Sequence, residues 1–341
     1  MNQEVPEMTQ GDAVTIRDVA KLAGVAVSTA SRALGNGSAS ARTRQKVQQA
    51  AEELHFVPNQ AAKQLTSGKS NIIAIMVPEE PDFVFRDAFV SGMVAQLATS
   101  FTAVNLLPFL ALTKPHDAKG FLKVLKGSGA AGIVVVSFHY SKPFADALKQ
   151  CGKLIVSIGT PSPSMHYPYV DVDNYQGGYD AVMLLHKRGC QHIAVIAGPT
   201  DMQASVLRTE GVKDALSSLG MEPVAFIPGE YGAQRGEEVM LQILSEHPEV
   251  DGVFAISDET AAGALRALLN SGKRVPEDVA LIGFDDFHVA RAVSPRLTTF
   301  AQPLAAMAET ATEMMSERLE TGEWKRKAVL FPAPMVRRES A

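Results

Sequence analysis

The sequence predicts an α/β protein with parallel sheets that carries a small all-α segment at its N-terminal end. Three observations lead to this prediction. Apolar runs of strand length alternate with helical segments from Asn71 onward, residues 14–58 show helical periodicity without strands, and the charge changes sign between these regions. Continuous apolar strands separated by helices are typical of parallel sheets covered on both faces. At 341 residues, two or three domain-sized units are expected.

The first 13 residues are polar, hold three acidic and no basic residues, and predict a flexible N-terminal extension. They do not resemble a signal peptide, and no apolar run in the chain is long enough to cross a membrane. Cys151 and Cys190 lack the spacing of metal ligands, so we interpret them as reduced, buried thiols. Together these features predict a cytoplasmic protein.

Residues 15–34 predict two short helices joined by a tight turn. Thr15 is a good N-cap for the first helix, Asp18 favours the positive end of that helix, and Gly24 marks the turn. A hairpin of this kind can place its second helix in the major groove of DNA, although an ordinary helical pair would show the same pattern. The second helix leaves a short polar and basic face made by Val27, Ser28, Thr29, Ser31 and Arg32.

A third helix and a short connecting segment follow. Ser40 is a good N-cap for a helix over Ala41–His55, which Pro58 ends. Residues 59–65 could form another helix, but seven residues are too few for a stable isolated helix in water. We therefore predict a helix-turn-helix domain over residues 14–58 and a hinge with its linker over residues 59–69.

Charge supports the boundary near residue 69. Residues 14–69 hold eight Lys or Arg and three Asp or Glu, whereas the whole chain has a formal net charge of −5. A basic head on an acidic body fits a head that contacts phosphate and a body that does not.

The body, residues 70–341, has too many strand and helix units for one sheet, so we expect two α/β lobes. The predicted strands include 72–77, 131–136, 154–158, 193–197, 253–256 and 279–284. The predicted helices include 88–99, 144–149, 179–187, 211–219 and 260–269.

Spaced motifs in the head give the chain a family resemblance. Residues 15–34 read T-I-x-D-V-A-x-x-A-G-V and then S-T-x-S-R-x-L, and Thr43-Arg44, Pro58-Asn59, Ala62 and Leu65 follow at fixed spacing. This pattern resembles the lactose-repressor/galactose-repressor (LacI/GalR) family of transcription regulators, and the resemblance extends over nearly the whole chain.

The resemblance implies a DNA contact surface and a hinge helix whose leucine, here Leu65, wedges into the minor groove and bends the DNA. The implied DNA-contacting residues are Thr15, Val27, Ser28, Thr29, Ser31 and Arg32 of the head, and Asn59, Ala62, Lys63 and Leu65 of the hinge. Arg32 is available for a guanine, the commonest specific contact.

The resemblance also implies a body like the periplasmic sugar-binding proteins, with two lobes hinged around a cleft. We expect lobe one over about residues 70–170 and 302–325, and lobe two over about 171–298 and 328–341. The chain would then cross between lobes near residues 169–172, 297–302 and 324–328.

Ligands of open α/β sheets bind at the carboxyl ends of strands. Charged groups, a hydroxyl and aromatic rings gathered there would suit a polyhydroxylated ligand. The resemblance implies that Arg208, which is expected at the start of a helix, contacts an effector together with Tyr231, Ser257 and Asp285. Phe83 and Phe85 could equally be pocket wall or core, and we expect Asp258 and Asp286 to cap helices or pair structurally.

Three features depart from common family patterns. Gly159-Thr160 replaces the Asp-Arg pair that many relatives carry, which removes two charged candidates from the pocket. Val27-Ser28 is smaller than the base-reading pair of the lactose repressor, so the operator should differ. No leucine heptads follow residue 336, which favours a dimer over a tetramer.

The sequence thus predicts a DNA-binding regulator, by default a repressor, that binds a near-palindromic operator as a homodimer. A sugar-like effector would control it, as an inducer or in the opposite sense as a corepressor. The alternative is a solute-binding protein of a sugar uptake system. We predict no enzyme, cofactor or metal, because no phosphate-binding glycine loop, metal-spaced cluster or Ser-His-Asp set is apparent.

Overall fold

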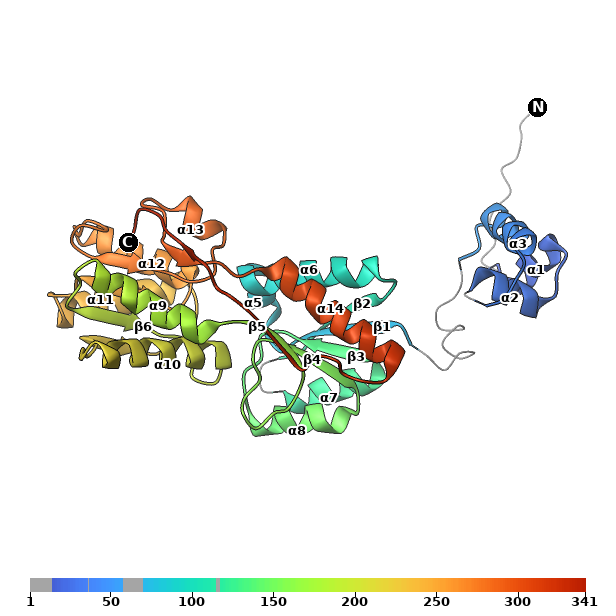
Figure 1. Cartoon of the computed structure of the whole chain (residues 1–341), viewed down its shortest axis with the longest axis horizontal. Coiled ribbons are helices and arrows are strands. Elements are labelled where there is room, and N and C mark those ends of the chain that lie inside the picture. Colours follow the sequence, from blue (N-terminus) through green and yellow to red (C-terminus); the bar gives the residue numbers. More distant parts are fainter. Residues whose placement is uncertain (1–13, 36, 58–69, 115–116) are drawn as a thin grey trace, which may run out of the picture. The chain divides into compact units, whose positions relative to one another are not determined.

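The computed structural model describes residues 14–35, 37–57, 70–114 and 117–341 (Figure 1). The chain forms two compact units, which divide between Ser70 and Asn71, and each is described by itself. Predictions for residues 1–13 and for the hinge residues Asn59, Ala62, Lys63 and Leu65 lie outside the described residues.

The head contains three helices, α1 (Ile16–Ala23), α2 (Val27–Leu34) and α3 (Ala41–Glu53). They pack around a core of mostly small residues, so the helices approach closely and little apolar surface holds them together. The buried residues are Val19, Ala20, Ala30, Ala33, Val47, Ala50 and Ala51.

The head's helices begin and end where the sequence predicts or close to it. The Asp18 carboxylate accepts hydrogen bonds from the Thr15 backbone N–H at 2.9 Å and the Thr15 hydroxyl at 2.7 Å, and the latter is the main cause that lowers the pKa of Asp18. Gly24 ends α1 in the left-handed conformation, with φ of 66°. The Ser40 hydroxyl accepts from the Thr43 N–H and caps α3, which ends two residues earlier than expected.

Arg44 of α3 fastens the loop that follows α2. Its guanidinium donates to the carbonyl oxygens of Ala33 and Gly35, both at 2.8 Å, and of Gly37 at 3.0 Å. A half-buried arginine with three backbone acceptors fixes where α2 ends, because each bond to a charged donor is stronger than a neutral one.

Lobe one of the body is built on a six-stranded sheet in the order β11-β5-β4-β3-β1-β2, and all its pairings are parallel. Helices α6 (Ala88–Ala103) and α14 (Leu304–Thr321) cover one face, and α7 (Ala118–Gly127) and α8 (Lys142–Cys151) the other, while α5 (Pro81–Arg86) follows β1 (Figure 1). The strands are β1 (Ile72–Val77), β2 (Leu107–Leu112), β3 (Gly132–Val135), β4 (Leu154–Ile158), β5 (Tyr169–Val172) and β11 (Ala328–Phe331).

Lobe two has a four-stranded parallel sheet in the order β7-β6-β8-β9. Helices α9 (Asn174–Lys187) and α10 (Gln203–Ser218) pack on one face, and α11 (Ala233–Glu246) and α12 (Asp258–Asn270) on the other. The remaining elements are β6 (Ile193–Ile196), β7 (Ala225–Ile227), β8 (Gly252–Ala255), β9 (Ala280–Ile282), α13 (His288–Ala292), and the antiparallel pair β10 (Thr299–Phe300) and β12 (Met335–Val336).

The lobe boundaries differ from the expected ones at two places. Strand β5 extends lobe one to Val172, and β11 pairs with β5 in the sheet of lobe one. The last crossing therefore follows Phe331, and the expectation of a crossing near residues 324–328 was wrong. The sequence of residues 328–331 does not show which sheet this strand joins, because its partner strand lies far away in the sequence.

Both cysteines are free and buried, as expected. None of the helices that the structure describes is long and apolar enough to cross a membrane.

Candidate functional site

The candidate DNA interface is the outer face of α2. Val27 is 43% exposed, Ser28, Ser31 and Arg32 are exposed, and Thr29 is half-buried. Arg32 donates from Nε to the Ser28 carbonyl oxygen at 3.2 Å, which uses one of the five N–H groups of its guanidinium. A short helix with exposed polar side chains and a basic C-terminal end can enter a groove and meet both bases and phosphates.

The body has a pocket lined by residues of both lobes. Five of the six predicted effector residues line it, namely Phe83, Arg208, Tyr231, Ser257 and Asp285. Phe85 does not, and its side chain is 67% exposed. Residues 83 and 85 would share a face of an extended strand, but here they belong to helix α5, where successive residues turn by about 100° and two positions apart point in nearly opposite directions.

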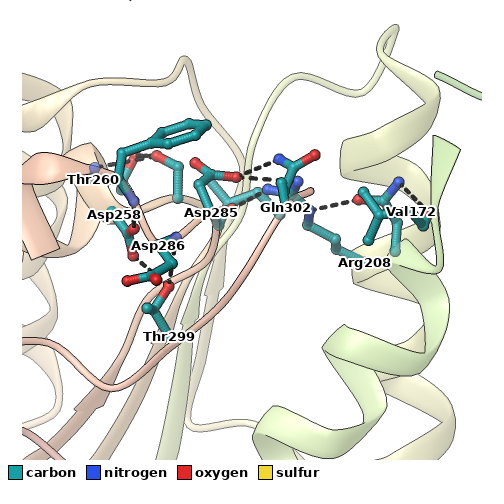
Figure 2. A network of polar contacts seen from close by, with 12 residues as sticks. Val172, Arg208, Asp258, Thr260, Asp285, Asp286, Thr299 and Gln302 are labelled. Carbon is teal, nitrogen blue, oxygen red and sulfur yellow. Dashed lines mark hydrogen bonds and ion pairs between the residues drawn. The ribbon is translucent and has the colours of Figure 1, made fainter. Parts of the chain in front are cut away.

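Arg208 is the centre of a hydrogen-bonded network (Figure 2). The residue is 4% exposed and lies in the second turn of α10, not at the helix start as expected. Its guanidinium donates to the Asn174 side-chain oxygen at 2.9 Å, the Ile256 carbonyl oxygen at 2.5 Å and the Asp285 carboxylate at 3.4 Å. It also stacks 3.6 Å above the centre of the Phe284 ring. Three acceptors and a ring hold this buried charge in one orientation.

The network reaches lobe one through Asp171. The Asn174 amide donates to both Asp171 carboxylate oxygens at 3.1 Å, and the Thr160 N–H and hydroxyl donate to the same carboxylate at 2.8 Å. Burial raises the pKa of Asp171, and the hydrogen bonds from Thr160 oppose that effect. Thr160 thus holds a buried carboxylate in the pocket.

Asp285 closes the other end of the network. It accepts from the Gln302 amide at 2.7 Å, on the segment that crosses back to lobe one. Its backbone φ is 118°, a strained conformation for a residue other than glycine, as is common at ligand sites. Burial raises the pKa of Asp285 to about 7, although the Arg208 charge acts in the opposite direction.

Asp258 and Asp286 have the structural roles expected of them. Asp258 accepts from the Thr299 hydroxyl at 2.6 Å and the Phe287 N–H at 3.0 Å, and burial raises its pKa to about 8. Asp286 pairs with Arg338 at 2.5 Å. Ser257 both lines the pocket and caps α12, because its hydroxyl accepts from the Thr260 N–H at 3.2 Å.

Two glycines let α9 and α10 approach closely enough to place Arg208. A Cβ on Gly178 would lie 2.1 Å from the Arg208 carbonyl oxygen, and one on Gly211 would lie 2.0 Å from the Tyr175 carbonyl oxygen. Both obstacles are backbone atoms, so no side chain can move to make room.

A second set of contacts joins the lobes. His139, which follows β3, lies 2.9 Å through Nδ1 from the Asp201 carboxylate of lobe two and 3.1 Å through Nε2 from the Glu79 carboxylate of lobe one. The Tyr140 N–H also donates to the Asp201 carbonyl oxygen at 2.8 Å. The two carboxylates outweigh burial and raise the pKa of His139 to about 9. We call His139, Glu79 and Asp201 the interlobe clasp.

Several pocket residues were not identified from the sequence. The pocket is also lined by Asp87, Asp171, Asn174, Glu259 and Gln302. Asp171 and Asn174 could have been found from their place at the end of β5, because the carboxyl ends of parallel strands meet at one edge of a sheet. Glu259 follows a predicted strand end by three residues, while Asp87 and Gln302 give no local signal.

No group of His, Cys, Asp or Glu side chains among the described residues could hold a metal ion.

Comparisons with known proteins identify the family. Residues 15–59 match the model of bacterial regulatory proteins of the lacI family, and residues 182–341 match a periplasmic binding protein-like domain. The HTH-type transcriptional regulator CelR of Thermobifida fusca is 36% identical over 317 residues, which cover 91% of this chain and 92% of that protein. The chain belongs to the lacI family of bacterial regulatory proteins.

Solved structures agree with this assignment. A CelR–cellobiose complex is 32% identical, with a TM-score of 0.76 over 96% of this chain and 100% of that chain. The Lac repressor dimer bound to operator has the same fold, with a TM-score of 0.86 over 96% of this chain and 99% of that one, at 24% identity. The protein is therefore a helix-turn-helix transcriptional regulator, and the solute-binding alternative is set aside.

Proposed function

We propose that this regulator is a repressor that binds a near-palindromic operator as a homodimer and releases it when a sugar occupies the pocket. The observation that carries the proposal is the network around Arg208, which runs from Thr160 in lobe one to Gln302 on a crossing segment. A ligand that replaces some of these contacts changes how the lobes are held together. Control of DNA binding then requires only that the ligand bind the two lobe arrangements with different affinity.

Cellobiose is the first effector to test. The similar CelR structure is named as a complex with cellobiose, and the pocket here has groups that suit a neutral disaccharide. Arg208, Asp285 and Ser257 can hydrogen-bond to hydroxyls, and Phe83 and Tyr231 can pack against the apolar faces of sugar rings.

The DNA-binding residues are the second part of the proposal. Thr15, at the start of α1, would contact phosphate, and Arg32 would read a guanine in the major groove. Leu65 would enter the minor groove at the operator centre. The other proposed contacts are Val27, Ser28, Thr29 and Ser31 of α2 and Asn59, Ala62 and Lys63 of the hinge.

A dimer is favoured by apolar side chains exposed at one edge of lobe one. Leu107 and Phe109 of β2 are 48% and 40% exposed, and Val104, just after α6, is 47% exposed. Exposed apolar groups gathered in one place are typical of an interface between chains.

The test begins with selection of a duplex that binds the full-length protein from a random DNA pool. Binding of the labelled duplex is then measured with and without each member of a panel of cellobiose, maltose, galactose and ribose. We expect one of these sugars to weaken DNA binding. Tighter DNA binding in the presence of sugar would show a corepressor, and no effect of any sugar would contradict the proposed effector class.

The wedge has its own test. Leu65→Ala should weaken binding of the selected duplex while it leaves binding of the sugar by the body nearly unchanged. Equal affinity of the variant and the wild type for the duplex would refute the role of Leu65.

A further inference from the structure

The charges that line the pocket are unbalanced. Arg208 is the only cationic side chain among the described residues that line it, whereas five carboxyl groups do so. These belong to Asp87, Asp171, Asp201, Glu259 and Asp285.

Three of the five N–H groups of this one guanidinium donate to the protein itself. Arg208 donates to Asn174, to the Ile256 carbonyl oxygen and to Asp285, and its face is covered by Phe284. An anionic ligand that reached the remaining N–H groups of Arg208 would lie beside the Asp285 carboxylate, which repels it. A site for phosphate or sulfate would instead present free N–H donors toward the ligand.

Two of the carboxyl groups that line the pocket, those of Asp87 and Glu259, have no cationic partner among the described residues. Asp87 caps α6 in lobe one, where it accepts from the Val90 N–H at 2.8 Å, and Glu259 lies in the first turn of α12 in lobe two. Burial is the main cause that raises the pKa of each, and the charges of described residues that act on them, Glu79 on Asp87 and Asp87 on Glu259, are negative.

The charge of Asp87, in lobe one, acts on carboxyl groups of lobe two. It contributes to the raised pKa of Glu259 and to that of Asp285, both of which belong to lobe two. The two walls of the pocket therefore present like charges to whatever lies between them.

We propose that this pocket selects uncharged carbohydrates and rejects anionic ones, with Asp87 and Glu259 as the residues that determine this specificity. The inference rests on the proposed function, because it concerns the effector of the same pocket. Carboxylates accept hydrogen bonds from sugar hydroxyls, so the same groups that repel an anion can bind a neutral sugar. A like charge within several ångströms in a partly buried site weakens binding by about tenfold or more.

The test uses the full-length protein, the member of the sugar panel that binds, and a monosulfate ester of that sugar. The sulfate keeps one negative charge at every pH used. By calorimetry we expect the ester to bind the wild type at least about tenfold more weakly than the neutral sugar.

The decisive variant is the double substitution Asp87→Asn and Glu259→Gln. Asparagine is as good an N-cap as aspartate, so α6 keeps its cap. We expect the preference for the neutral sugar to shrink to about threefold or less, because most of the repulsion is lost. The matched control is Glu80→Gln with Glu238→Gln, which removes two exposed charges, one from each lobe, that do not line the pocket, and it should keep the wild-type preference.

Acidity gives an independent readout. The raised pKa values of Asp87 and Glu259 mean that these groups take up protons at a higher pH than exposed carboxyls do. The preference of the wild type for the neutral sugar should therefore decrease as the pH is lowered, and it should decrease more than that of the double variant, in which Asp171 and Asp285 remain as pocket carboxyls with raised pKa values.

Equal binding of the two sugars by the wild type would overturn the inference, and so would a preference that survives in the double variant. Binding of the sulfate ester without any binding of the neutral sugar would overturn it as well. Failure of every sugar, neutral or sulfated, would instead refute the proposed effector class, and this inference with it.

Discussion

The outer face of α2 in the head and the pocket of the body hold their arginines in opposite ways. Arg32 is exposed and makes one hydrogen bond to its own helix, whereas Arg208 is 4% exposed, makes three hydrogen bonds and stacks on a ring. A DNA duplex is large and brings a fixed pattern of donors and charges, so free side chains on a rigid helix suffice to meet it. A sugar makes few contacts, and its site must be ordered before it arrives.

The largest effect should follow from breaking the ordered site. Arg208→Ala removes a buried charge that Asp285 and Asn174 are arranged to meet, and should lower the free energy of unfolding by about 3–5 kcal/mol. Sugar binding, and with it the effect of sugar on DNA binding, should be lost, while DNA binding by the head remains. Calorimetry measures the loss of sugar binding, and a binding assay with the selected duplex measures whether DNA binding remains.

Arg235→Ala is the matched control, because this arginine of α11 is partly exposed and does not line the pocket. It should respond to sugar as the wild type does. A sugar response that survives in Arg208→Ala would show that the pocket is assigned wrongly.

The second prediction tests whether Arg44 keeps helix α2, which carries the exposed side chains of the head, in place. Arg44→Ala leaves three carbonyl oxygens after α2 without their donor and should destabilise the head by about 2–3 kcal/mol. Because the core of the head is small, the head has little stability to lose, and DNA binding should fall as well. Thermal unfolding followed by circular dichroism measures the change. Arg42→Ala, at an exposed position of the same helix, should unfold like the wild type.

A smaller effect is expected at the free side chain. Arg32→Ala should weaken binding of the selected duplex by about tenfold through loss of one base contact. Its melting temperature should not move, because Arg32 makes a single, exposed hydrogen bond with the described part of the head. If the duplex bound equally well to this variant, the reading role would belong to another residue.

The smallest effect concerns the interlobe clasp. The pKa of His139 is raised to about 9 from its usual 6.5, so the folded state binds this proton more tightly than the unfolded state. The stabilisation is therefore complete below pH 6.5 and is lost as the pH rises through about 9. Between pH 7 and 9.5 the wild type should lose about 2 °C more in melting temperature than His139→Gln. Parallel pH profiles would show that the clasp does not contribute.

The head could be predicted almost completely from its sequence, because caps and turns such as Thr15, Gly24 and Ser40 act on residues that are their neighbours. The central strands of the body were also found, since β1 and β4 are continuous apolar runs. The edge strands β2, β7 and β11 were not among the predicted strands, and neither was the internal strand β5, whereas the edge strand β9 was expected within residues 279–284. Strand β2 contains Pro108, which is tolerated only at an edge because it donates no hydrogen bond to the sheet.

The pocket was predicted in part. Arg208 and Asp285 came from the family resemblance, but their partners Asn174 and Gln302 did not, because these contacts join segments that lie far apart in the sequence. Phe85 was misplaced because α5 was not expected. Each of these outcomes depends on contacts between residues far apart in sequence, which local patterns do not encode.

The most direct test of the central claim is fluorescence anisotropy of the selected duplex with full-length protein, measured with and without the sugar that binds. A sugar in the pocket should lower the affinity of the wild type for the duplex by about tenfold, a typical allosteric coupling of 1–3 kcal/mol. The same sugar should leave the affinity of Arg208→Ala unchanged. A wild-type affinity that is the same with and without bound sugar would contradict the account.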